Sequence, residues 1–243
     1  LHKVLKEFFG SAGEAKSNFY RPLQMIAQMI DYSLCGFNVQ GYHLTSILLH
    51  ILSAVFLYFF VRLIVYDANI SFFASLLFLA HPINTEAVSY ISGLSDPLSL
   101  LFMLLCLVSY IKYLQAQNII LYILALLSFG MALLSKENAM FVPALILLYH
   151  YAFRKNFKIN KILLFFVVLL SYILFRLAIL VPFAQSTITF TDLLQRIPGF
   201  FASITEYLRL LLLPFDLHIE YGNKLFNYSD PRVINGLFLS CLL

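Results

Sequence analysis

Five long stretches without any charged side chain follow one another in this 243-residue sequence. A helix needs about 20 mostly apolar residues to cross the hydrocarbon core of a membrane, which is about 30 Å thick. A single stretch of this kind can be a buried helix of a soluble protein, but five in series cannot plausibly be explained in that way. The sequence therefore predicts a chain that crosses a membrane repeatedly. The charge-free stretches are 68–85, 97–111, 113–135, 138–153 and 162–175.

The composition agrees with a membrane protein. Charged residues make up 12% of the chain, about half of their share in a typical soluble domain. The cations are scattered among apolar runs, so no nucleic-acid-binding surface is predicted. The three cysteines, Cys35, Cys106 and Cys241, are too far apart in the sequence to predict a disulfide framework or a cysteine metal site.

The predicted architecture is an all-α bundle of transmembrane helices at residues 42–243, preceded by an external region at residues 1–41. Short helices of that region are expected to lie along the membrane surface. Pro198 and Gly199 divide the stretch 192–213, which predicts an interfacial or re-entrant segment. We interpret the chain as a fragment truncated at both ends, because it starts without Met and stops inside an apolar run. Spans are expected at about 42–62, 70–81, 97–112, 119–135, 138–153, 161–181 and 231–243.

Positively charged loops predict the orientation of the bundle. Loops rich in Lys and Arg stay in the cytoplasm, and the densest basic segment is 154–161. Counting spans outward from this segment places Arg62 and Lys112 on the same side. The loop 82–96 and the turn 135–138 then lie on the non-cytoplasmic side.

Most side chains that could carry chemistry are expected on that non-cytoplasmic side. Ionisable groups at membrane depth are costly and are often functional. The alternating Asp216, His218 and Glu220 are too weak a pattern to assign a metal, so we predict no metal ligands. The sequence establishes no cofactor with certainty, and a divalent cation stays an open but unsupported alternative. The candidate functional residues are Arg21, Glu86, Asp96, Lys136 and Arg176.

Two of these candidates, both acidic, also have structural explanations. Asp96 stands directly before Pro97, a pattern typical of a helix N-cap followed by the first helical residue. Glu86 follows His81-Pro82 by about one helical turn, where the chain is too apolar for an ordinary solvated loop. Glu86 could therefore make a structural hydrogen bond or face a functional cavity.

The basic candidates have alternatives too. Lys136 and Glu137 could neutralise each other in a tight turn, or Lys136 could face an anionic headgroup or phosphate. Arg176 is expected near the headgroup level, where long side chains snorkel. His50 shares a helix face with His43 and is predicted to make a hydrogen bond to another helix.

Several motifs occur here in an order that resembles the membrane half of the transmembrane-and-tetratricopeptide-repeat O-mannosyltransferases and their bacterial relatives. These enzymes belong to the GT-C superfamily of polyprenyl-phosphate-sugar-dependent glycosyltransferases. The motifs are FYRPL (19–23), GYHLTSILLH (41–50), FLAHPINTEAVSYISGLSDPLSLLF (78–102), LLSKENAMFVP (133–143) and YLRLLLLPFDLHIEYG (207–222).

The resemblance implies a GT-C-like bundle with its active site at the non-cytoplasmic face of a bacterial inner membrane or of the endoplasmic reticulum membrane. It implies a polyprenyl- or dolichyl-phosphate donor of mannose or another hexose, and a hydroxyl acceptor on a protein or glycan. The family's general base is an acid after the first span, which is expected before Leu1. Leu94-Ser95-Asp96 departs from relatives that have a basic residue before the Asp.

Sugar transfer requires a carboxylate that takes the acceptor's proton and cations that stabilise the departing phosphate. Glu86 and Asp96 are therefore the predicted catalytic residues. Arg21, Lys136 and Arg176 are predicted to bind the lipid phosphate of the donor.

Two other classes of function stay open at this point. A transporter or flippase of a lipid-linked or anionic substrate would suit the helix break at His81-Pro82, although no internal repeat is detectable. A non-catalytic membrane scaffold with the same fold is the third interpretation.

Overall fold

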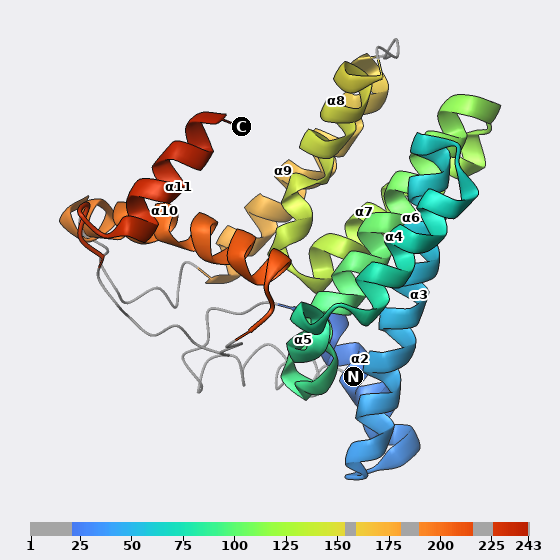
Figure 1. The fold of residues 1–243 in the computed structure, drawn as a ribbon. Helices are drawn as coiled ribbons and strands as arrows, with labels where there is room; N and C mark the ends of the chain where they lie inside the picture. Colours follow the sequence, from blue (N-terminus) through green and yellow to red (C-terminus); the bar gives the residue numbers. More distant parts are fainter. Residues whose placement is uncertain (1–20, 154–158, 181–189, 216–225, 243) are drawn as a thin grey trace. The chain divides into compact units, whose positions relative to one another are not determined.

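A computed structural model (Figure 1) describes the chain over residues 21–153, 159–180, 190–215 and 226–242. Every regular element in these ranges is a helix, which confirms the all-α fold. The chain forms two compact units, Leu1–Phe183 and Ala184–Leu243.

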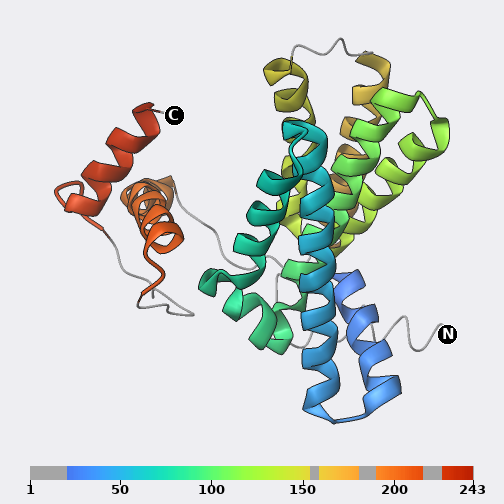
Figure 2. The ribbon, with the colours of Figure 1, turned by 45° about the vertical axis from the view of Figure 1, so that its right-hand side comes forward.

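The first unit is a helix bundle in which α6 packs between α3 and α7, as Figures 1 and 2 show. Its longer helices are α2 (Pro22–Cys35), α3 (Val39–Val65), α4 (Ala68–Ala80), α6 (Ser95–Ala116), α7 (Ile119–Ser135), α8 (Val142–Ala152) and α9 (Ile159–Leu180). Short helices connect them: η1 (Pro82–Asn84), α5 (Thr85–Ser89), η2 (Ile91–Leu94) and η3 (Glu137–Phe141).

Three helical segments of the described residues are long and apolar enough to cross a membrane: Val39–Val65, Ile91–Ala116 and Ile159–Ala178. Ala68–Ala80 and Ile119–Ser135 are apolar but shorter. Large apolar side chains on their outer surfaces are exposed, among them Phe73, Leu77 and Leu127. An outward-facing apolar surface of this kind suits a bundle whose solvent is lipid.

Local sequence signals set the ends of several helices. The side chains of Asn38, Asp67 and Asn118 cap α3, α4 and α7 by accepting hydrogen bonds from backbone N–H groups of the first turn. His81-Pro82 ends α4, and the His81 Nδ1 atom accepts a hydrogen bond from the backbone N–H of Ile83 at 3.2 Å.

The core of the first unit lies where α6, α7, α8 and α9 meet. Phe129 and Phe165 are fully buried there, and the small residues of α7, such as Ala125 and Ala132, allow α6 to approach closely. The Tyr110 hydroxyl and the His150 Nε2 atom form a buried hydrogen bond of 2.8 Å. Polar contacts between helices thus occur even in the apolar core.

His50 makes the predicted hydrogen bond to another helix. Its Nε2 atom lies 3.2 Å from the backbone carbonyl oxygen of Leu79, the last residue but one of α4. The contact joins α3 to α4 two residues before the His81-Pro82 break, and the prediction for His50 is confirmed.

Helix α2 turns its polar side toward the bundle and its apolar side outward. Gln24 and Gln28 donate hydrogen bonds to backbone carbonyls at Ser92 and Ile91, at 2.8 Å and 3.4 Å. The buried Asp31 carboxylate accepts a hydrogen bond of 2.6 Å from the Thr45 hydroxyl. These polar contacts attach α2 to the bundle beside α3 (Figure 2). The exposed outer side consists of Met25, Ile26, Met29, Ile30 and Leu34.

The second unit contains α10 (Phe190–Leu212) and α11 (Pro231–Leu242), which pack on each other. The predicted division at Pro198 is wrong, because α10 continues through this residue. Proline removes one backbone hydrogen bond and tends to kink a helix, but here the turns after it are fastened to α11. The Thr205 hydroxyl donates to the backbone carbonyl of Arg232 at 2.8 Å. Gly236 approaches so closely that an added Cβ atom would lie 1.9 Å from the carbonyl oxygen of Phe201.

Candidate functional site

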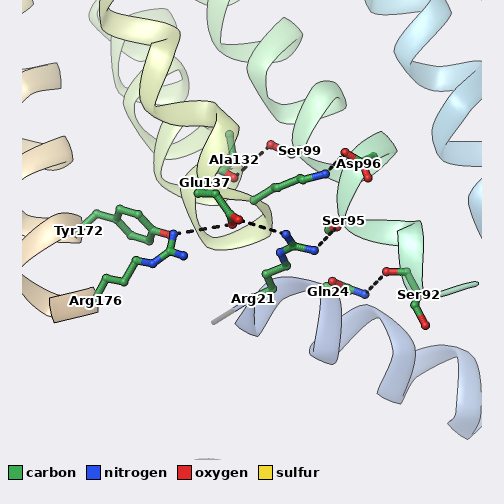
Figure 3. A network of polar contacts seen from close by, with 11 residues as sticks. Arg21, Gln24, Ser92, Ser95, Asp96, Ser99, Ala132, Glu137, Tyr172 and Arg176 are labelled. Carbon is green, nitrogen blue, oxygen red and sulfur yellow. Dashed lines mark hydrogen bonds and ion pairs between the residues drawn. The ribbon is translucent and has the colours of Figure 1, made fainter. Parts of the chain in front are cut away.

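A polar network joins four elements at the end of the first unit where α6 begins (Figure 3). Its members come from the N-terminal end of α2, the first turn of α6, the segment between α7 and α8, and α9. Three cations and two carboxylates give the network a net charge of +1 at neutral pH. The charged residues are Arg21, Asp96, Lys136, Glu137 and Arg176.

Arg21 connects α2 to two neighbouring elements. Its Nη2 atom donates a hydrogen bond of 3.2 Å to Glu137 Oε1, and its Nη1 atom donates one of 3.2 Å to the Ser95 hydroxyl. Arg21 directly precedes α2, and Gln24 holds the next turn of that helix against Ser92. Hydrogen bonds therefore hold the guanidinium of Arg21, and the contact between Gln24 and Ser92 holds the start of the helix that follows it (Figure 3).

Glu137 lies between two arginines. Its Oε2 atom is 3.7 Å from Arg176 Nη1, while its Oε1 atom accepts the hydrogen bond from Arg21. The Oε2 atom is buried and accepts no hydrogen bond from the described residues. The Arg176 Nη1 atom in turn donates a hydrogen bond of 3.3 Å to the Tyr172 hydroxyl.

The charge state of Glu137 follows from these neighbours. Burial alone would raise the pKa of its carboxyl group, but hydrogen bonds from Arg21 and from the backbone act against burial. Together with the positive charges of Arg21 and Arg176, they lower the pKa below its ordinary value. Glu137 is therefore an anion at neutral pH.

Lys136 forms a separate ion pair in which its Nζ atom donates to Asp96 Oδ1. Lys136 ends α7 with extended backbone angles, φ −156° and ψ 145°. Its side chain therefore leaves on a different side from that of the next residue, Glu137. The interpretation of Lys136 and Glu137 as a mutually neutralising pair is wrong, because each binds a partner on another helix.

The predicted N-cap role of Asp96 is also wrong. Helix α6 begins one residue earlier, at Ser95, and Leu94 occupies the N-cap position without a side-chain hydrogen bond. Asp96 thus lies inside the first turn, where the helix dipole stabilises a negatively charged side chain. Its carboxylate is engaged by Lys136 instead of by backbone N–H groups.

Glu86 takes no part in the network. It lies in the first turn of α5, and its side chain is exposed. The carboxylate makes no hydrogen bond or ion pair with the described residues, whereas the backbone carbonyl accepts a hydrogen bond of 2.9 Å from the Tyr90 N–H. Of the five predicted site residues, the structure brings Arg21 and Arg176 to one carboxylate and joins Lys136 to Asp96. Glu86 stands apart as a carboxylate without a counter-ion in the described part of the chain.

Sequence reasoning missed the roles of Glu137, Ser95 and Tyr172 in the network. Glu137 carried one usable signal: with Lys136 it interrupts a charge-free run on both sides. Ser95 and Tyr172 carried none, because single hydroxyl groups are common in apolar helices.

No group of three or more potential metal ligands occurs among the described residues. The alternating Asp216, His218 and Glu220 lie outside the described residues. The arrangement instead favours an anionic ligand, since arginine binds phosphate oxygens through paired N–H groups and lysine contributes a point charge.

Comparison with known proteins identifies a family. The family model of the dolichyl-phosphate-mannose-protein mannosyltransferases matches residues 22–181. This range includes every helix that carries the network, and of the charged residues of the network only Arg21 lies outside it. No solved structure matches the chain.

The chain is also similar to three curated proteins that are each named a protein O-mannosyl-transferase. Protein O-mannosyl-transferase TMTC2 of Homo sapiens is 36% identical over 116 residues, which are 46% of this chain and 14% of the relative. Protein O-mannosyl-transferase TMTC3 of Homo sapiens is 33% identical over 149 residues, 59% of this chain and 16% of the relative. Protein O-mannosyl-transferase F38B6.6 of Caenorhabditis elegans is 29% identical over 162 residues, 63% of this chain and 23% of the relative. The chain thus spans less than a quarter of the length of these relatives.

Proposed function

This chain belongs to the dolichyl-phosphate-mannose-protein mannosyltransferase family, and from that premise we propose that it transfers a mannosyl group from a polyprenyl-phosphate carrier to a hydroxyl group of a protein. The family model matches residues 22–181, and the GT-C superfamily, which the sequence motifs resemble, uses donors of this kind. The reaction is proposed to take place at the end of the bundle that carries Arg21, Asp96, Lys136, Glu137 and Arg176.

The observation that carries this proposal is the convergence of two arginines from distant parts of the chain on one carboxylate. Arg21 and Arg176 both contact Glu137, and Lys136 is its neighbour in the sequence. Cations are costly at the end of a membrane helix unless they are paired or bind a ligand. The excess positive charge of the network suits the single negative charge of a phosphodiester.

The chemistry accounts for the need for cations. The acceptor oxygen forms a bond to the anomeric carbon of mannose, and the bond from that carbon to the phosphate oxygen breaks with its electron pair going to the phosphate. The phosphate charge rises from about −1 to about −2 in this step. Guanidinium and ammonium groups placed beforehand stabilise such developing charge. We assign this role to Arg21, Arg176 and Lys136.

The proton of the acceptor hydroxyl must pass to a base. Asp96 is already engaged by Lys136, so we propose that it orients the lysine. The exposed Glu86 has no counter-ion among the described residues. We propose that Glu86 orients the acceptor hydroxyl or assists the base of the reaction.

The proposed active face is non-cytoplasmic, periplasmic or luminal. Asp96 and Lys112 lie 16 residues apart in α6, about 24 Å at 1.5 Å per residue, so they belong to opposite ends of the bundle. Lys112 lies over the Phe59 ring at 5.8 Å, near the end of α3 that carries Arg62. The positive-inside rule favours the cytoplasm for that end and the opposite side for the network.

A transfer assay tests the proposal. The full-length protein in detergent is given dolichyl-phosphate mannose and a Ser/Thr-containing peptide, and the mannosylated peptide is quantified by mass spectrometry. We expect Arg176→Ala to reduce transfer about 100-fold or more, the cost of losing one transition-state donor, and Lys136→Ala to reduce it as well. Arg232→Ala, in the second unit, is the control. Wild-type rates in both site variants would exclude the proposed site.

A further inference from the structure

Glu137 is the only carboxylate of the described residues that contacts two arginines, one directly before α2 and one in α9 (Figure 3). We propose that Glu137 is a positioning residue, which holds the Arg176 guanidinium in the orientation that stabilises the charge developing on the donor phosphate during transfer. This inference rests on the function proposed above and adds a residue that does not itself touch the substrate.

The two contacts of Glu137 differ in kind. The contact with Arg21 is a hydrogen bond of 3.2 Å, whereas the Oε2 atom lies 3.7 Å from Arg176 Nη1, beyond ordinary hydrogen-bond length. Glu137 is thus anchored on Arg21 and attracts Arg176 by charge. Such a contact directs a guanidinium without occupying its N–H groups.

Some N–H groups of Arg176 donate no hydrogen bond to the described residues. A guanidinium carries five N–H donors, and the hydrogen bond of Arg176 to the Tyr172 hydroxyl is its only one within the described residues. Its side chain is 20% exposed, so the guanidinium is partly accessible to a ligand. Tyr172 and Glu137 fix the direction of the guanidinium from two sides, and a phosphate can take the open donors.

Local contacts hold the backbone around Glu137 in place. Glu137 opens η3, whose Ala139 is fully buried and donates its backbone N–H to the Lys136 carbonyl at 3.2 Å. On the other side, Ser95 and the α2 contacts hold Arg21. A carboxylate supported from both directions can set the geometry of Arg176 within the narrow tolerance that a binding site requires.

This role predicts a specific kinetic signature. Glu137→Gln removes the attraction for Arg176 and raises the net charge of the network from +1 to +2. The donor phosphate in its ground state is still attracted, so the KM for the donor should not rise. In the transition state, however, additional negative charge develops on the phosphate. The misaligned Arg176 stabilises this charge less well. The loss should appear in kcat.

The experiment measures kcat and KM for dolichyl-phosphate mannose with the full-length protein, per folded molecule as judged by size-exclusion chromatography. Glu137→Gln should lower kcat about 10- to 100-fold, the usual cost of losing a residue that orients a ligand, with an unchanged or lower KM. Glu137→Asp keeps the charge on a shorter side chain and should give an intermediate kcat. Glu206→Gln is the matched control, since Glu206 pairs with Arg209 in the second unit at 2.9 Å; its kinetics should stay at the wild-type values.

Four results would overturn the inference. Wild-type kcat in folded Glu137→Gln, or a raised KM with unchanged kcat, would show that Glu137 does not align Arg176. If Glu137→Gln does not fold, wild-type kcat in Glu137→Asp would lead to the same conclusion. Absence of transfer by the wild-type protein would remove the proposed function and this inference together, so the two failures are distinguishable.

Discussion

The side chains of Lys136 and Glu137, adjacent in the sequence, form ion pairs with different helices. Lys136 binds Asp96 in α6, and Glu137 lies between Arg21 and Arg176. The extended backbone at Lys136 separates the two side chains. One turn between α7 and α8 thereby joins α2, α6 and α9, and most of our predictions concern this turn.

The first prediction concerns the acid stability of the network. Because the pKa of Glu137 is lowered in the fold, its ion pairs stabilise the protein fully above the pKa of the unfolded state, about 4.3. This contribution is lost as the pH falls through the lowered folded-state pKa. We expect the Glu137 carboxyl group to have no effect on the pH dependence of the detergent melting temperature between pH 8 and pH 5. Below about pH 4, its protonation should lower the melting temperature.

The control for acid stability is Glu137→Gln, which cannot lose a proton. Its melting temperature should be lower than that of the wild type at pH 7 and should fall less between pH 5 and pH 3. Parallel curves for the two proteins would show that Glu137 does not contribute to the acid transition.

The second prediction separates Glu86 from Asp96. Glu86 is exposed and unpaired within the described residues, so Glu86→Gln should leave the melting temperature unchanged and lower transfer. Asp96→Ala breaks the contact with Lys136 at a carboxylate that is 41% exposed, which should cost at most about 1 kcal/mol of stability and should also lower transfer. Full transfer by Glu86→Gln would remove Glu86 from the proposed site.

The third prediction concerns the crossing of α10 and α11. A Cβ atom at position 236 would lie 1.9 Å from the Phe201 carbonyl oxygen, so Gly236→Ala should separate the two helices and destabilise the second unit. Gly130→Ala is the matched control, because no neighbouring atom lies within 4 Å of its added Cβ. It should be neutral or stabilise the protein by up to about 1 kcal/mol. Limited proteolysis of the second unit would measure the difference, and equal digestion of both variants would contradict it.

The fourth prediction concerns topology. Single cysteines are placed at Ser89, in α5, and at Gln117, in the turn after α6, in a background without native cysteines. Both positions are exposed, and α6 separates them. A membrane-impermeant thiol reagent applied from the non-cytoplasmic side should label position 89 and not position 117. Equal labelling, or the reverse pattern, would contradict the proposed orientation.

The fold was largely predictable from the sequence, since charge-free stretches mark membrane helices and Pro or Asn mark several of their ends. Two local predictions failed for physical reasons. Asp96-Pro97 has the pattern of a helix start, but a partner 40 residues away, Lys136, binds the carboxylate instead. Pro198 interrupts a helical pattern, but packing on α11 outweighs its local effect.

The candidate site was predictable in its residue types and not in its pairing. Arg21, Lys136 and Arg176 are recognisable because cations are rare in such a sequence. Which carboxylate each one binds depends on how helices far apart in the chain pack, and no local pattern records this. Glu137 illustrates the limit, since its sequence neighbour is the one cation of the network that it does not bind.

The contacts of Glu137 also determine when the network can be completed during biosynthesis. Arg21 emerges from the ribosome 116 residues before Glu137, and Arg176 emerges later still. At roughly 5–20 residues per second, Arg21 is without this partner for several seconds at least, and α9 must enter the membrane before the second arginine arrives. The site is thus among the last parts of the first unit to form, and an unfinished chain cannot hold its phosphate-binding groups in place.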